Sequence, residues 1–230
     1  VLLEKPVLET AAEAAKLDGI TRDGRAFILP GHVLRFSADH AQLRSVVKSG
    51  AIGDVIYISS RRYRDSPHAE RYPDTDPVLM TLIHDIDLAV WLAPARFVRA
   101  RGCRTEGPGF RSLTTADLET ADGVRCHLRT AWTFETGDLP PDRLEVVGQR
   151  GSIELDAGVS LRLYAEGHCT ALPLALADDS LANEHDAFLS RIRDGAAPLA
   201  VTMADAITGL TLADAILESL GSRRDVEIRW

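Results

Sequence analysis

The sequence predicts an α/β unit followed by an α+β domain with an open, mostly antiparallel sheet, and three patterns indicate this fold class. Residues 1–29 read as strand, helix and strand, which is typical of a parallel βαβ crossover. From residue 124 onward, apolar and polar side chains alternate with a period of two, as in half-buried antiparallel strands. Two amphipathic segments, 181–195 and 202–221, predict closing helices.

The prediction of a βαβ unit at the start of the chain depends on short local sequence patterns. Val1-Leu2-Leu3 is apolar without alternation, as expected of a strand buried on both faces. Thr10 precedes Glu13 by three residues, which is a capping-box spacing at the start of an Ala-rich helix. Residues 26–29 predict the second strand. Because a two-stranded parallel sheet cannot cover its faces, we expect further strands upstream of residue 1.

The middle of the chain predicts a helix over 38–49, a strand over 54–62 and a loop over 65–77. A helix over 78–92 follows from an apolar stripe at helical spacing, made of Leu79, Leu82, Ile83, Ile86 and Val90. Further strands are expected at 124–134, 144–147, 153–155, 159–163 and 225–230. The apolar face of such a sheet needs a cover, from helices of this chain or from another subunit.

Composition excludes several classes of function. The net charge of −8 and the pI of about 5.4 give no electrostatic support for nucleic-acid binding. The basic run 61–64 is interpreted as a solvated strand end. Cys103, Cys126 and Cys169 contain no CxxC pair, so we expect no disulfide framework and a reducing, cytoplasmic location. No apolar run reaches the length of a membrane span, so no membrane partner is expected.

The first candidate site is Glu4-Lys5-Pro6, directly after the first predicted strand. Ligands of open α/β sheets bind beyond the carboxyl ends of the strands, so Lys5 is well placed for a ligand. Pro6 also raises the chance of a cis peptide bond at this turn. The alternative interpretation is a surface lysine in a strand-to-helix turn.

The second candidate is the pair His84 and Asp87 on the helix over 78–92. Removal of a hydride from an alcohol carbon requires a base for the hydroxyl proton. Histidine titrates near neutrality, and a nearby carboxylate can orient it or raise its pKa. The alternative is a histidine hydrogen-bonded in the core. No third ligand stands at metal spacing, so no metal is expected, and His185 falls on an apolar stripe that indicates packing.

Taken in order, six motifs make the chain resemble the glucose–fructose oxidoreductase / inositol dehydrogenase (Gfo/Idh/MocA) family. The motifs are Glu4–Pro6, Gly31–Phe36, Ser49–Asp54, His84–Leu88, Val147–Ile153 and an ending made of Phe188–Pro198 with the helix start Thr202–Ala206. Each motif alone has little specificity, whereas six in this order along nearly the whole chain are specific.

The resemblance implies that residues 1–36 are the last part of a Rossmann domain that binds NAD or NADP. It implies that residues 37–230 form a substrate-binding and oligomerisation domain, with the open sheet face in a homo-oligomer contact. The activity expected is hydride transfer between a nicotinamide and a hydroxyl or keto carbon of a sugar or polyol. Two alternatives stay open, namely an NAD-dependent glycosidase and a truncated, non-catalytic binding or assembly subunit.

The resemblance also implies roles for single residues. Lys5, His84 and Asp87 are expected to be catalytic, with His84 exchanging the hydroxyl proton. The residues expected near the cofactor are Glu4, Lys5, Pro6 and Arg35.

Two features depart from the family pattern. Met80 stands one helical turn before His84, where many members carry an aspartate that completes a proton relay. Without that aspartate, either the proton relay is shorter, or Thr81 or a water molecule takes its place. The GxGxxG turn and the acidic ribose-binding residue are absent from the 230 residues, and we expect them upstream of Val1.

Overall fold

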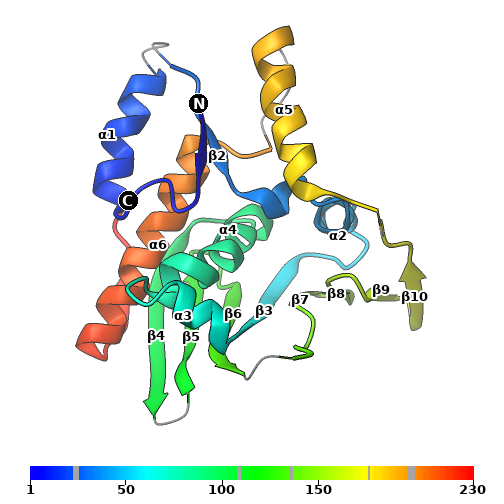
Figure 1. Cartoon of the computed structure of the whole chain (residues 1–230). Coiled ribbons are helices and arrows are strands. Elements are labelled where there is room, and N and C mark those ends of the chain that lie inside the picture. The colour runs from blue at the N-terminus through cyan, green and yellow to red at the C-terminus, as the bar shows by residue number, and fades with distance from the viewer. Residues whose placement is uncertain (23–25, 108–109, 135–136, 176, 196–199) are drawn as a thin grey trace.

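The computed structural model describes residues 1–22, 26–107, 110–134, 137–175, 177–195 and 200–230, and the strands of this part of the chain form two separate sheets (Figure 1). Strands β1 (Leu2–Glu4) and β2 (Leu29–Gly31) pair in parallel, and helix α1 (Ala11–Arg22) connects them. The second strand begins at Leu29 rather than at residue 26. The reason is its short partner, because Leu2 at the start of β1 pairs with Leu29.

The larger sheet has nine strands in the order β10-β9-β8-β7-β3-β6-β5-β4-β11. Its strands are β3 (Val55–Asp65), β4 (Phe97–Gly107), β5 (Phe110–Thr120), β6 (Arg125–Phe134), β7 (Arg143–Gly148), β8 (Gly151–Asp156), β9 (Ser160–Ala165), β10 (His168–Leu172) and β11 (Val226–Glu227). The mostly antiparallel character that the sequence predicts is confirmed. The exception is β3, which runs parallel to β6 because helices cross over between them.

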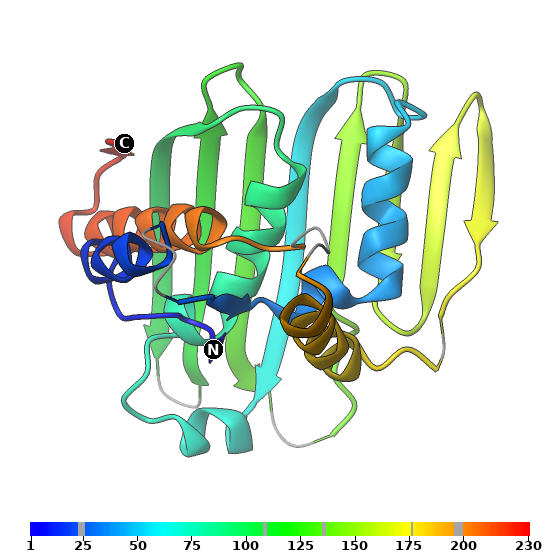
Figure 2. The same ribbon diagram turned by 90° about the horizontal axis from the view of Figure 1, so that it is seen from above.

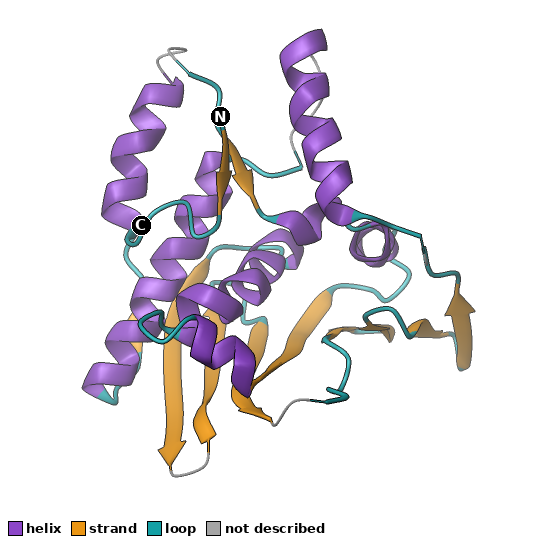
Figure 3. Cartoon of the chain, viewed as in Figure 1, coloured by secondary structure: helices purple, strands orange, loops and turns teal. Residues whose placement is uncertain are grey.

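The helices lie on one face of this sheet, and no described element covers the other face (Figures 1 and 3). They are η1 (Val33–Phe36, a 3₁₀ helix), α2 (Ala38–Lys48), α3 (Ser66–Arg71), η2 (Val78–Leu82, a π-helix), α4 (Ile83–Leu92), α5 (Ser180–Asp194) and α6 (Met203–Ser222). Seen from above, α6 lies over β4 and α2 over β8, with the main hydrophobic core between helices and sheet (Figure 2). No helix in the described residues combines the length and the apolar character needed to cross a membrane.

Strands β4 and β5 were not predicted, because apart from Phe97 and Leu118 many of the positions that they bury hold small or polar residues. Inward positions of β4 include Ala100 and Gly102, and those of β5 include Ser112, Thr114 and Ala116. Such residues carry little hydrophobic periodicity, so the alternation that marks a strand is weak there. Long-range pairing with β6 decides their conformation.

Two local expectations were wrong, and the predicted helix over 78–92 is confirmed with a different hydrogen-bond pattern in its first turn. The segment predicted as a loop over 65–77 contains α3, which begins because the Asp65 side chain accepts a hydrogen bond from the His68 amide and Pro67 occupies the first turn. The helix predicted over 78–92 starts as the π-helix η2. Helix α6 runs past Gly221 and ends at Ser222, and its C-cap residue Arg223 takes the left-handed conformation (φ 56°).

Helix α5 buries a different face from the one its apolar stripe indicates. Leu189 and Ile192 are 56% and 60% exposed, and His185 is exposed too, so the prediction that His185 packs in the core is wrong. The buried residue of this helix is Glu184, which is 0% exposed. Helix α5 contacts η1 at the edge of the molecule, and within its apolar stripe Phe188 stacks on Phe27 (5.8 Å between ring centroids) while Leu189 and Ile192 stay exposed.

Two of the sequence motifs meet in one tight contact. In the turn after β7, the amide of Gln149 donates to Asp54 O (2.9 Å) and that of Arg150 donates to Ile52 O (2.8 Å). Gly148 allows this approach, since a Cβ atom there would lie only 2.3 Å from Ile52 O. The motifs 49–54 and 147–153 therefore serve packing between α2 and the sheet.

We expect Gly148→Ala to destabilise the protein by about 1–3 kcal/mol, because the added methyl group must push the backbone of Ile52 away. Urea unfolding followed by circular dichroism measures the loss. The matched control is Gly19→Ala in α1, where an added Cβ would meet nothing within 4 Å and helix propensity improves. Equal stability of Gly148→Ala and wild type would contradict the contact.

Glu184 predicts a pH-dependent stability. Burial, and secondarily the charge of Glu4, raise the pKa of Glu184 from its ordinary 4.5 to about 7. The folded state thus binds more protons than the unfolded state between these values, so this group's contribution to stability falls as the pH rises from about 4.5 to about 7.

We therefore expect Glu184→Gln to exceed wild type in stability at pH 8, by on the order of 1–2 kcal/mol, and to lose this advantage at pH 4. Urea unfolding at the two pH values is the measurement. Asp186→Asn changes an exposed carboxylate on the same helix and serves as the control. A pH-independent difference between Glu184→Gln and wild type would exclude the buried acid as its source.

Candidate functional site

Lys5 reaches from the βαβ unit to the helix that carries His84. It follows the carboxyl end of β1, and its peptide bond to Pro6 is cis, as the sequence suggested. The half-buried ammonium group donates a hydrogen bond from Nζ to the backbone oxygen of Met80 (2.8 Å). Met80 lies within η2, and π-helical turns of this kind are frequent at functional sites.

The pKa of Lys5 is lowered, mainly by burial. The nearby carboxylate of Glu4 opposes this effect, while the positive charges of Arg62 and Arg64 add to it. A lysine whose pKa moves toward neutrality can exchange a proton more readily than a solvated one, and while charged it can stabilise an oxyanion.

His84 is held in its neutral form. Its pKa is well below the ordinary value because the ring is desolvated and because Arg62, Lys5 and His32 place positive charge around it. None of the described residues hydrogen-bonds the ring. A neutral imidazole with a free nitrogen can accept a proton, which is the property required of a general base.

Asp87 does not pair with His84, contrary to expectation. Its two carboxylate oxygens accept hydrogen bonds from Nε and Nη2 of Arg35 (2.9 and 2.8 Å), and His32 Nδ1 lies 3.5 Å away. Arg35 in turn donates to Ala200 O (3.1 Å) and lies 3.2 Å from Asp205. The guanidinium binds the carboxylate in a bidentate geometry that the His84 ring cannot offer.

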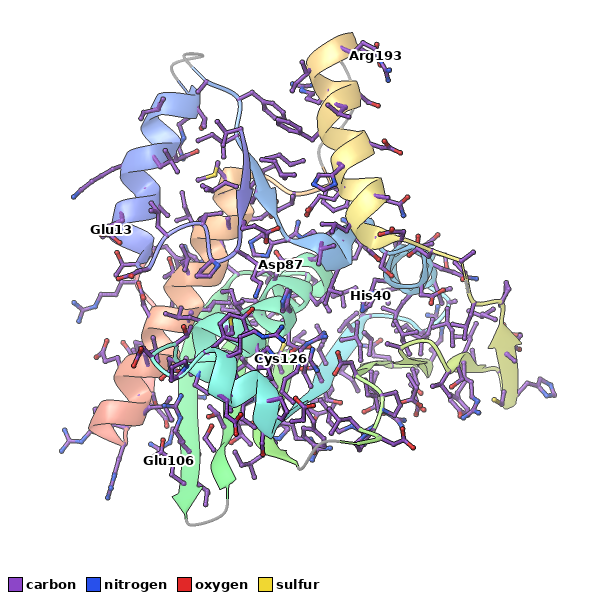
Figure 4. All side chains as sticks on the ribbon, in the orientation of Figure 1. Glu13, His40, Asp87, Glu106, Cys126 and Arg193 are labelled. Carbon is purple, nitrogen blue, oxygen red and sulfur yellow. The ribbon has the colours of Figure 1, made fainter. Side chains whose placement is uncertain are left out.

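This ion pair also changes the interpretation of Arg35. The side chain is only 2% exposed and all its observed contacts are internal, so the structure does not present it to a cofactor. Figure 4 shows Asp87 near the middle of the molecule, below β2 and on α4. Both residues hold η1 and the start of α6 against α4.

A second buried ion pair flanks His84 on the other side. Arg62 donates from Nε and Nη2 to the carboxylate of Asp85 (3.0 and 3.2 Å), and it also bonds Asp142. Arg64 donates to both oxygens of Asp142 (3.0 and 3.1 Å). The interpretation of the run 61–64 as a solvated strand end is therefore wrong for Arg62, which is 6% exposed. Its period-two relation to buried Ile58 on the same strand could have indicated this.

Thr81 was considered as a substitute for the missing relay aspartate. Its hydroxyl oxygen is buried and accepts a hydrogen bond from Nε1 of Trp132 (2.9 Å). Trp132 lies on β6, so this bond fixes η2 to the sheet. The indole occupies one lone pair of that oxygen, and the Thr81 hydroxyl forms no hydrogen bond with His84.

Comparisons with known proteins support the resemblance. Residues 40–154, half of the chain, match the family model described as the GFO/IDH/MocA C-terminal domain. Inositol 2-dehydrogenase 2 of Saccharopolyspora erythraea is 29% identical, with 99% of this chain and 70% of that protein covered. Inositol 2-dehydrogenase of Salmonella typhimurium is 26% identical over 95% of this chain and 67% of its own length.

Solved structures share the fold. A UDP-N-acetylglucosamine 3-dehydrogenase from Acidithiobacillus ferrooxidans superposes with a TM-score of 0.83 and 22% identity, over 96% of this chain and 70% of that one. An oxidoreductase from Agrobacterium radiobacter, in complex with NAD+, L-tartaric acid and magnesium, superposes with a TM-score of 0.82 and 18% identity. The match covers 99% of this chain and 72% of that one. The chain belongs to the Gfo/Idh/MocA family of oxidoreductases.

Proposed function

We propose that this chain is the substrate-binding part, with the last βαβ unit of a Rossmann domain, of an NAD(P)-dependent oxidoreductase acting on a hydroxyl or keto carbon of a sugar or polyol. The observation that carries the proposal is the contact between the desolvated Lys5 and the helix of His84. The names of the relatives, inositol 2-dehydrogenases, support this substrate class.

We assign the nicotinamide cofactor to the carboxyl ends of the paired strands β1 and β2. The two backbones approach so closely that a Cβ on Gly31 would lie 3.1 Å from the Cα of Glu4. Ligands of parallel sheets bind beyond such strand ends, so Glu4, Lys5 and Pro6 would line the nicotinamide end of the site. When bound, the nicotinamide supplies the hydride acceptor or donor.

Lys5 and His84 have different roles at the substrate hydroxyl. Neutral His84 accepts the hydroxyl proton, because its low pKa leaves the ring nitrogen free near neutral pH. The ammonium group of Lys5 donates a hydrogen bond to the oxygen on which negative charge develops. Asp87 acts only indirectly, since its bond to Arg35 holds α4 in place.

The Lys5→Ala variant tests the proposal in the natural full-length protein, with NAD+ or NADP+ and myo-inositol or another polyol. We expect kcat to fall by about 10²–10³-fold, as for loss of an oxyanion donor. Cofactor reduction at 340 nm is the readout. Lys16→Ala removes an exposed lysine of α1 and is expected to leave turnover unchanged.

Three results would overturn the assignment. Undiminished turnover by Lys5→Ala would remove Lys5 from the chemistry. Release of an aglycone from a glycoside without net cofactor reduction would favour the NAD-dependent glycosidase, which oxidises its substrate only transiently. Failure of the wild type to turn over any polyol or glycoside would favour a non-catalytic subunit.

We also propose that the open face of the large sheet forms a homo-oligomer contact. This face carries cross-strand ion pairs, among them Arg125 with Glu119 (3.2 Å) and His127 with Asp117 (2.7 Å). It also holds a hollow of about 270 Å³ bordered by Arg61, Arg129 and Glu145. Such an interface would be polar, and its association would be sensitive to salt.

Light scattering coupled to size exclusion measures this association. We expect the wild type to be oligomeric at low salt and Arg129→Glu to shift the population toward monomer by roughly tenfold in dissociation constant, because it reverses a charge on the surface that would face the other subunit. Arg193→Glu on the exposed part of α5 is the control. An Arg129→Glu protein with the wild-type mass at all concentrations would exclude this face.

A further inference from the structure

His68 lies against the candidate site from an element that the sequence did not predict. It belongs to α3, and its ring packs edge-to-face on Trp132 with 4.9 Å between ring centroids. Trp132 is buried and donates its indole hydrogen bond to Thr81. Thr81 adjoins Met80, whose backbone oxygen binds Lys5. A continuous series of contacts therefore joins His68 to Lys5.

The ring of His68 has a polar atom without a partner. Its Nε2 is buried, and no described residue forms a hydrogen bond with it. An unpaired buried polar group costs about 1–3 kcal/mol, and native proteins keep few of them. Functional sites are one place where such groups persist, because the ligand supplies the missing partner.

The charges around His68 keep the ring neutral. Burial lowers its pKa most, Arg64 from β3 and Lys5 from the end of β1 lower it further, and Arg71 of its own helix does the same. Only Asp65, which caps α3, opposes them. A neutral imidazole can either donate or accept a hydrogen bond at Nε2, which suits a hydroxyl group.

Four other side chains beside Lys5 are less suited to this function, and His32, whose Nδ1 also lacks a hydrogen bond to any described residue, lies 3.5 Å from the Asp87 carboxylate instead. Met80 has only a weakly accepting sulfur, and the Thr81 hydroxyl already accepts a hydrogen bond from Trp132. Arg62 and Arg64 are bound to carboxylates. His68 therefore combines closeness to Lys5 with a ring nitrogen that has no partner.

We propose that His68 is a substrate-binding residue, whose Nε2 hydrogen-bonds a hydroxyl of the polyol or sugar next to the one that reacts. This inference rests on the proposed function. It assigns to α3 the recognition of a polyhydroxylated ligand.

The test compares His68→Phe and His68→Gln in the natural full-length protein with myo-inositol and other polyols. Phe keeps the ring contact with Trp132 but removes the nitrogen, so we expect KM for the polyol to rise roughly 10- to 100-fold. KM for the nicotinamide and the melting temperature should stay near the wild-type values. Gln offers an amide near the position of Nε2 and should recover part of the loss. His168→Phe, at an exposed site on β10, is the matched control.

The outcomes separate this inference from the proposed function. An unchanged polyol KM in His68→Phe, with Lys5→Ala inactive, would overturn the role of His68 alone. Parallel losses of melting temperature and kcat in both His68 variants would reduce His68 to a packing residue and overturn it too. Absence of any polyol turnover by the wild type would overturn both proposals.

Discussion

The buried ion pair between Arg35 and Asp87 is the interaction on which the rest of the site depends. Both side chains are 2% exposed, and every contact that satisfies them comes from another segment of the chain. Two charges without such compensation would be costly to bury, and removal of one partner from such a pair typically costs about 3–5 kcal/mol. The pair therefore locks η1, which continues β2, onto α4 and the start of α6.

Helix α4 is held by a second ion pair on its other side. Asp85 and Asp87 are two residues apart, so their side chains point to different flanks of the helix. One binds Arg62 of the large sheet and the other binds Arg35 beyond the small sheet. His84 thus sits on a helix anchored from both sheets. The motif His84–Asp87 combines one residue for chemistry with two carboxylates that set its position.

The local sequence determined a substantial part of the fold. Helix α2, the Thr202–Asp205 capping box of α6 and the end of α5 at Gly195 were predicted, because each depends on residues within a few positions of one another. The same holds for the cis bond between Lys5 and Pro6. The six motifs also led from the sequence to the Gfo/Idh/MocA family.

Tertiary structure alone decided which charges meet. The sequence placed Asp87 close to His84, but Arg35, 52 positions away, takes its carboxylate because a guanidinium satisfies both oxygens at once. The burial of Arg62 beside Asp85, the small inward residues of β4 and β5, and the contact of His68 with Trp132 likewise arise from distant segments. The spacing of residues along the chain does not predict these contacts, because each contact depends on how the two sheets and their helices pack.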